Sequence, residues 1–125
     1  MDDYKEIIKN RLAELTPELR GFVLGDNWRV ALKSIASKFN LSDEQYAPFE
    51  NEVFFVLICL EPYEDFAENL NTEIGIDANV SSWIAEDVEK EIFDPVLTEI
   101  QAVWENTKSE SEENGGDEDV NAEKN

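Results

Sequence analysis

The sequence predicts an all-α protein, a compact bundle of five to seven short helices built around two helical hairpins, with a disordered acidic C-terminal tail. Two observations support this fold. Apolar residues recur at helical spacing between start and stop signals, and a similar pattern occurs twice, in Phe39–Ile58 and Ile74–Phe93. After Trp104 the composition becomes polar and acidic, too poor in apolar residues to offset the entropy of ordering. We therefore expect a helical domain over 1–106 and a disordered tail over 107–125.

The first forty residues divide into three expected helices. Apolar residues at helical spacing predict a helix over Asp3–Leu15, followed by a short one over Pro17–Leu24. A third helix is expected between Asp26 and Asn40. The start and stop signals are Thr16 as an N-cap, Pro17 at the first helical position, Gly25 as a left-handed stop, Asp26 as a cap and Asn40 as a stop.

The two copies of the repeated pattern each end at an acid–proline step. Ser42 and Gln45 form a capping box that begins a helix reaching about Leu60, where Glu61-Pro62 ends it. A helix over Pro62–Ile74 follows, with Gly75 as its stop. The second copy is capped by Asp77, runs to Phe93 and ends at Asp94-Pro95, after which a last helix reaches Trp104. Offset by the same interval, Glu52, Val53 and Leu57 match Asp87, Val88 and Ile92.

The repetition predicts two antiparallel hairpins packed face to face, which would bury both apolar stripes. Two copies are fewer than an open solenoid needs, so a closed bundle is favoured. Duplication of one hairpin and independent use of ordinary helix signals both account for the pattern.

The charge of the chain is strongly negative and unevenly placed. The formal net charge is −20. Residues 1–40 hold seven Lys/Arg and six Asp/Glu, whereas residues 41–106 hold one lysine and seventeen acids. Such a field attracts basic proteins or cations and repels nucleic acid and anionic lipid. We therefore expect a protein partner, with a basic one favoured, and no direct binding of nucleic acid.

Several classes of site find no support in the residues. The chain has no histidine, and its five glycines are too scattered for a phosphate loop. Its one cysteine, Cys59, lies in the most apolar run and is interpreted as a core residue. We expect no catalytic residue, metal or cofactor, and hence no enzyme. The lone cysteine, the lack of a long apolar stretch and the polar N-terminus predict a cytoplasmic protein with no membrane segment.

The aromatic residues suggest a core and a candidate contact. Trp28, Trp83 and Trp104 each fall on an apolar stripe, which favours the core. Phe54 and Phe55 are adjacent and point about 100° apart on a helix, so they cannot share one narrow stripe. Their helix is therefore either central, which we favour, or half turned toward a partner or a second copy of the chain.

The acidic residues Glu86, Asp87, Glu89, Glu91 and Asp94 form a candidate acidic face. The simpler interpretation is a solvated surface that keeps the protein soluble. The alternative is mimicry of nucleic-acid phosphates, because one charge per ~2.4 Å of helix is comparable with one per ~1.7 Å of duplex axis.

The stretches Ile35–Leu70 and Trp83–Val96 contain "LSDEQ", "FENEV" before an apolar run, and "IFDP". In these residues the chain resembles short, uncharacterised all-helical proteins of candidate-phyla bacteria. The resemblance covers about residues 35–96, implies an all-helical fold and supplies no catalytic residues.

Together these observations predict a non-enzymatic helical protein–protein interaction module, such as an adaptor or a structural component of a larger assembly. Its contact would use the surface around Phe54 and Phe55 or the mixed-charge first helix. The alternative is an acidic nucleic-acid mimic that inhibits a DNA- or RNA-binding protein. Self-association is a further form of partner.

Overall fold

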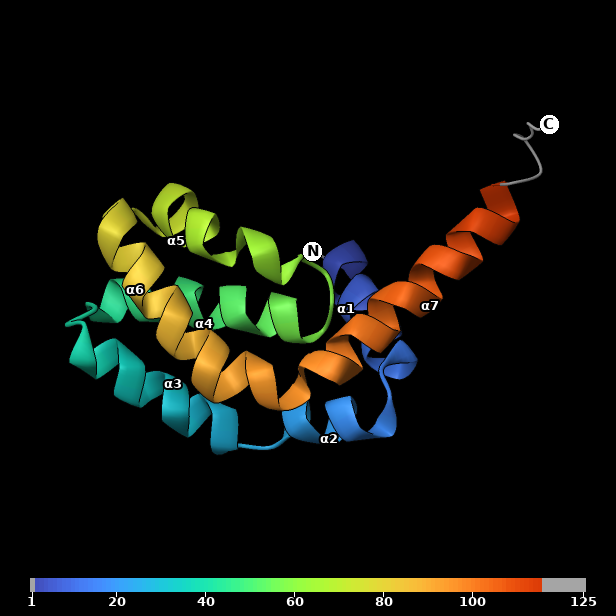
Figure 1. Ribbon diagram of the computed structural model, residues 1–125, viewed down its shortest axis with the longest axis horizontal. Helices are drawn as coiled ribbons and strands as arrows, with labels where there is room; N and C mark the ends of the chain where they lie inside the picture. Colours follow the sequence, from blue (N-terminus) through green and yellow to red (C-terminus); the bar gives the residue numbers. More distant parts are fainter. Residues whose placement is uncertain (1, 116–125) are drawn as a thin grey trace.

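The computed structural model describes the backbone of residues 2–115 and the side chains of residues 4–107, and every regular element in that part of the chain is helical (Figure 1). The fold is a compact all-helical bundle. The helices are α1 (Asp2–Glu14), α2 (Pro17–Leu24), α3 (Asn27–Lys38), α4 (Asp43–Leu57), α5 (Phe66–Ile74), α6 (Ala78–Val88) and α7 (Leu97–Gly115). Short turns of other helix types precede α5, as η1 (Tyr63–Asp65), and separate α6 from α7, as η2 (Glu89–Phe93) and η3 (Asp94–Val96).

Most of the predicted helix signals act as expected. The hydroxyl of Thr16 accepts a hydrogen bond from the backbone N–H of Leu19 at 3.2 Å. Ser42 and Gln45 form the complete capping box of α4. The carboxylate of Asp77 accepts from two backbone N–H groups at the start of α6. Gly75 ends α5 in the left-handed region at φ 82°, and Asn40 also takes a positive φ of 58° after α3.

Two signals act differently from the prediction. Gly25 is not left-handed but extended, with φ −80° and ψ 176°. Its N–H still satisfies the end of α2 by donating to the carbonyls of Gly21 and Phe22. Asp26 is at the N-cap position of α3, but its side chain makes no cap hydrogen bond. Its backbone carbonyl accepts hydrogen bonds from backbone N–H groups of the first turn instead.

Helix α4 ends at Leu57, before the predicted end near Leu60. The cause lies in Cys59, whose positive φ of 65° reverses the backbone. This reversal lets the N–H groups of Leu60 and Glu61 donate to the carbonyl of Phe55, at 2.9 and 3.3 Å. Such a left-handed residue is a common way to satisfy the last carbonyls of a helix.

The second acid–proline step does not break the chain direction as the first does. Pro62 is extended, with ψ 140°, and the chain turns into η1 and α5. At Asp94-Pro95 the backbone stays helical through the π-turn η2 and the 3₁₀ turn η3, so α6 passes into α7. In a regular α-helix the ring of Pro95 would meet the carbonyl of Glu91. The wider π-turn immediately before it changes the hydrogen-bond register, with Asp94 N–H donating to Glu89.

The core lies between the two predicted hairpins, α3–α4 and α5–α6, and is closed by α2 and the start of α7. The rings of Phe49 and Phe66 have centroids 6.4 Å apart, and those of Phe66 and Phe93 are 5.3 Å apart, which links the hairpins through the interior. The matched positions Val53 and Val88 are both fully buried, as are Leu57 and Ile92.

The three tryptophans occupy different environments. Trp28 is buried and donates its ring N–H to the carbonyl of Val23 at 3.0 Å. Trp104 is half-buried. Trp83 is 56% exposed, so its predicted place in the core is wrong. Helix α6 instead buries a face that includes Ser81, Ile84 and Val88, and Trp83 points away from that face.

Helix α7 continues past the expected domain end at residue 106 and reaches Gly115, extending beyond the other helices in Figure 1. Of the tail predicted to be disordered, 107–125, the residues 107–115 belong to α7, and the residues 116–125 lie outside the described part of the chain. Among the helices of the described part, none is long and apolar enough to cross a membrane.

Candidate functional site

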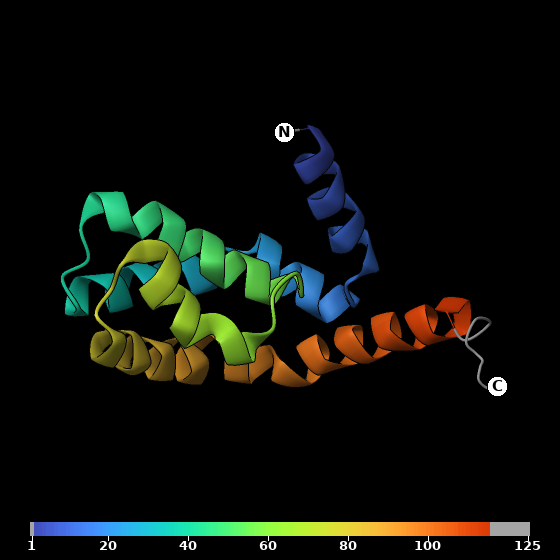
Figure 2. The ribbon, with the colours of Figure 1, turned by 90° about the horizontal axis from the view of Figure 1, so that it is seen from above.

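Helix α1 is the least buried helix of the bundle. In Figure 2 it stands away from the layers formed by the other helices. Of the side chains that the structure describes in α1, none is fully buried; Tyr4 is 47% and Ile7 is 50% exposed. Only Ile8 and Leu12 pack partly against the core. Because an isolated helix of this length is marginal in water, α1 depends on a small number of contacts.

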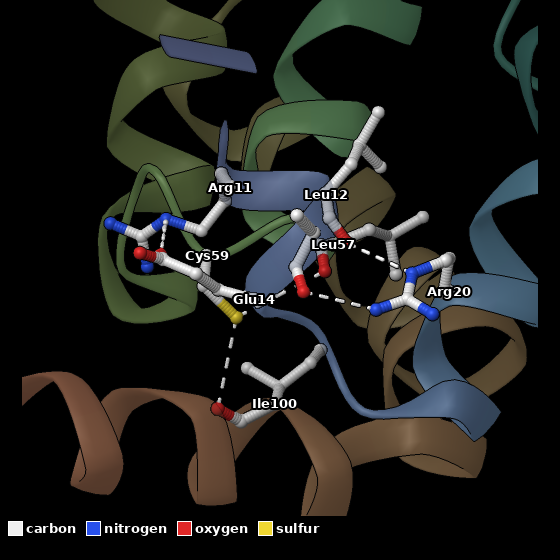
Figure 3. Close-up of polar contacts among 8 residues, drawn as sticks. Arg11, Leu12, Glu14, Arg20, Leu57, Cys59 and Ile100 are labelled. Atoms are coloured by element: carbon white, nitrogen blue, oxygen red, sulfur yellow. Dashed lines mark hydrogen bonds and ion pairs between the residues drawn. The ribbon is translucent and has the colours of Figure 1, made fainter. Parts of the chain in front are cut away.

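The C-terminal end of α1 is held by a single arginine of α2 (Figure 3). The guanidinium of Arg20 donates to the carbonyls of Leu12, Ala13 and Leu15, at 3.0, 3.1 and 3.0 Å. These are carbonyls that a helix end leaves without intrahelical partners. A fork of planar donors suits several neighbouring acceptors. The anchor therefore fixes the C-terminal end of α1 and makes no contact with its N-terminal half.

The N-terminal half of α1 touches the other predicted contact region. The ring of Tyr4 lies against that of Phe55, with centroids 5.7 Å apart and an interplanar angle of 85°. Phe55 in turn lies beside Phe54, at 6.1 Å. Both phenylalanines are half-buried, at the edge of a helix whose neighbouring residues are fully buried. The two surfaces that the sequence offers as alternatives thus meet through the contact of Tyr4 with Phe55. Ile7 is three residues after Tyr4, which places it on the same face of α1. We call the patch of Tyr4, Ile7, Phe54 and Phe55 the α1–α4 surface.

The candidate acidic face does not form one continuous row. Glu86, Glu91 and Asp94 are exposed, while Asp87 and Glu89 are half-buried. Asp87 is paired with Lys38 of α3, with Oδ2 and Nζ 2.8 Å apart. Partial burial, followed by the charges of Asp94 and Glu86, raises the pKa of Glu89. The stretch therefore divides between an ion pair that joins α6 to α3 and a group of carboxyl groups around Glu89.

The structure also contains a carboxyl pair that the sequence analysis missed. Glu52 of α4 is only 9% exposed, and among the residues that the structure describes its Oε1 has no hydrogen-bond partner. The carboxyl group of Glu61 is close enough to raise the pKa of Glu52. One signal was present in the sequence: Glu52 follows Phe49 and precedes Val56 at helical spacing, so an acid occupies the buried stripe. The partner Glu61 could not be found, because only the turn after α4 brings it back.

Cys59 is buried, as expected for a core residue. Its Sγ is 3.7 Å from the carbonyl oxygen of Ile100 in α7, as drawn in Figure 3. Burial raises the pKa of the thiol to about 12, against a smaller opposing effect of the Arg11 guanidinium. A thiol of this kind is a poor nucleophile.

Two grooves on the surface lie away from the α1–α4 surface and from the acidic face. One, of about 330 Å³, runs between α3 and the start of α4. Another, of about 290 Å³, lies between η1 and α7. The first is lined by Lys33, Ala36, Ser37, Leu41, Ser42, Asp43 and Tyr46, and the second by Pro62, Tyr63, Glu64, Ile100, Gln101, Trp104 and Glu105. Neither contains a residue of the α1–α4 surface or of the acidic face.

Within residues 4–107, no group of three or more Cys, Asp or Glu side chains is arranged to hold a metal ion. Comparisons with family models, with curated proteins and with solved structures find no match. The resemblance to proteins of candidate-phyla bacteria stays a prediction. The site must therefore be interpreted from its own geometry.

Proposed function

We propose that the protein is a non-enzymatic helical interaction module and that its partner protein binds across the α1–α4 surface. The observation that carries this proposal is the state of α1. None of the side chains that the structure describes in α1 is fully buried, and about half of the surface of Tyr4 and of Ile7 is exposed to solvent. The helix is nevertheless anchored at one end by Arg20. A helix presenting apolar side chains suits helix-in-groove recognition.

The charge beside this surface supports a basic partner. Residues 41–106 hold one lysine and seventeen acids. Partial burial, followed by the charge of Glu61, raises the pKa of Tyr4, so an acidic group of this segment lies close to the α1–α4 surface. A partner with apolar anchors flanked by Lys or Arg would match both features. Apolar burial would supply most of the affinity, and the charges would mainly increase the association rate.

The second candidate function is inhibition of a DNA- or RNA-binding protein by mimicry. It is supported by the exposure of Glu86, Glu91 and Asp94 and by the net charge of −20. Pairing of Asp87 with Lys38 removes one carboxylate from the face. Binding through such a face would depend almost entirely on charge and would weaken steeply as salt rises.

The experiment is affinity capture by the tagged full-length protein from lysate of its own cells, with parallel washes at low and high salt. Ile7→Ser tests the α1–α4 surface. Val30→Ser is its matched control, because Val30 is also a β-branched residue exposed on a helix, at 66%, in α3. Captured proteins are identified by mass spectrometry and then purified for binding measurements.

The proposal expects a specific protein retained at high salt, lost with Ile7→Ser and kept with Val30→Ser. A basic nucleic-acid-binding protein released by salt, and unaffected by Ile7→Ser, would favour the mimic. Capture that is equal for both variants would overturn the α1–α4 surface as the contact. Sedimentation of the purified protein at rising concentration tests whether a second copy is the partner, with the same two variants.

A further inference from the structure

Glu52 and Glu61 meet where α4 ends and the chain turns toward α5. Glu52 lies in the buried stripe of α4, whereas Glu61 lies in the turn after it. The amide Nδ2 of Asn69, in α5, donates to Oε1 of Glu61 at 3.1 Å. Within the part of the chain that the structure describes, no donor reaches Oε1 of Glu52, which is shielded from solvent.

This arrangement is unfavourable if both groups are ionised. A buried charged oxygen without a hydrogen-bond donor loses its hydration without compensation. Two carboxylates are acceptors only, so neither can satisfy the other. A single proton changes both facts: it supplies an O–H donor between the groups, and it removes the repulsion of two like charges.

The groups that face Glu52 come from three other segments. Glu61 approaches from the turn, Glu73 and the amide of Asn69 from α5, and Tyr4 from α1. Arg11 of α1 pairs instead with Glu14, with Nε and Oε1 3.5 Å apart (Figure 3). Burial, followed by the contact with Glu61, raises the pKa of Glu52 to about 7, while Asn69 acts in the opposite direction.

We propose that Glu52 and Glu61 share one proton, and that this proton acts as a latch on the turn that joins α4 to α5. The turn is the part able to respond. It is held by the N–H groups of Leu60 and Glu61, which both donate to the carbonyl of Phe55, and its reversal depends on the left-handed Cys59. Loss of the proton places two negative charges in a poorly hydrated site, and outward movement of the turn would carry Glu61 away from Glu52 and relieve their repulsion.

The sign of the pH effect follows from linkage. The folded state binds this proton more tightly than the unfolded chain, in which glutamate titrates at about 4.3. The stabilisation is therefore complete below the unfolded range and is lost as the pH rises through about 7. The chain has no histidine, so few other groups titrate in this interval. Between pH 6 and pH 8 the equilibrium constant of unfolding should rise roughly tenfold.

The test is urea unfolding of the full chain at pH 6 and pH 8, for the natural protein and two variants. Glu52→Gln keeps the shape of the side chain and removes the titration. Glu68→Gln is the matched control, because it removes one carboxylate from the exposed side of α5 beside Asn69. We expect the roughly tenfold change in the natural protein and in the control, and a change below about twofold for Glu52→Gln.

Two further measurements keep the proposal testable if Glu52→Gln fails to fold. Glu61→Gln removes the other half of the pair and should also flatten the pH profile. Carbon-13 NMR of the glutamate carboxyl groups should show one that titrates near neutrality. Hydrogen exchange tests the latch itself: at pH 8 the amides of Leu60 and Glu61 should exchange faster in the natural protein than in Glu52→Gln. An unchanged pH profile in Glu52→Gln, or titration of Glu52 in the ordinary range, would overturn the proposal.

Discussion

The ring of Tyr4 in α1 meets the ring of Phe55 in α4 edge to face, at a centroid distance of 5.7 Å. This contact is made by a helix that otherwise has little buried surface. The position of α1, and with it the shape of the α1–α4 surface, depends on this pair and on the Arg20 anchor at the other end.

A double-mutant cycle should detect the ring contact. Tyr4→Ala and Phe55→Ala, alone and together, are expected to show a coupling of about 0.5–1.5 kcal/mol in the free energy of unfolding. The control cycle pairs Tyr4→Ala with Trp83→Ala, because Trp83 is an exposed aromatic residue of α6 that takes no part in the Tyr4–Phe55 contact. Additive losses in the first cycle would show that the contact does not hold α1.

Replacing Arg20 by lysine should loosen α1 while keeping the charge. Lysine cannot reach three carbonyls in a fixed fork, so we expect a loss of about 1–3 kcal/mol, as for hydrogen bonds to a charged group. Hydrogen exchange in α1 should accelerate more than exchange in α6. Arg11→Lys is the control. Within the described residues the guanidinium of Arg11 makes one ion pair, with Glu14, and its Nη1 has no hydrogen-bond partner. Equal effects would argue against the anchor.

The two glycines Gly75 and Gly21 should respond to alanine with opposite signs. At Gly75, φ is 82°, so Gly75→Ala should destabilise the protein by about 1–2 kcal/mol. Gly21 lies within α2, and a methyl group there meets no other atom within 4 Å. Gly21→Ala should therefore stabilise by about 0.5–1 kcal/mol. Thermal unfolding of both variants checks this; a stabilising Gly75→Ala would contradict the left-handed assignment.

The thiol of Cys59 should react only when the chain opens. Burial and a pKa raised to about 12 leave almost no accessible thiolate at pH 8. An aromatic disulfide reagent should label the unfolded protein in urea rapidly and the native protein at a rate limited by opening. Fast labelling without urea would mean that the α4–α5 turn or α7 is open in solution.

Local signals in the sequence were sufficient to predict much of the fold. Thr16, Ser42, Asp77 and Gly75 bound their helices as expected, because a cap or a left-handed stop acts on its own neighbours within one turn. The acid–proline steps were less informative, because an acid followed by proline ends a helix at one place and not at the other. At Asp94-Pro95 the chain passes through a π-turn and remains helical.

The same distinction applies to the candidate site. Phe54 and Phe55 could be selected because two adjacent residues of a helix point about 100° apart and cannot share one narrow stripe. The contact of Phe55 with Tyr4 could not be predicted, since it requires the path of the chain through α2. Trp83 fell on an apolar stripe but lies outside the buried face of α6. The Glu52–Glu61 pair depends on the left-handed backbone of Cys59, and the spacing of apolar residues in a helix does not predict such a conformation.

The ring of Phe66, packed between Phe49 and Phe93, gives the bundle its cooperativity. It places a residue of α5 between one from α4 and one from the π-turn after α6, so neither hairpin has a complete interior of its own. Chain fragments divided near Pro62 would each expose part of this stack and would be expected to fold only when mixed. Whatever the origin of the repeated pattern, we expect the two halves to unfold as a single unit.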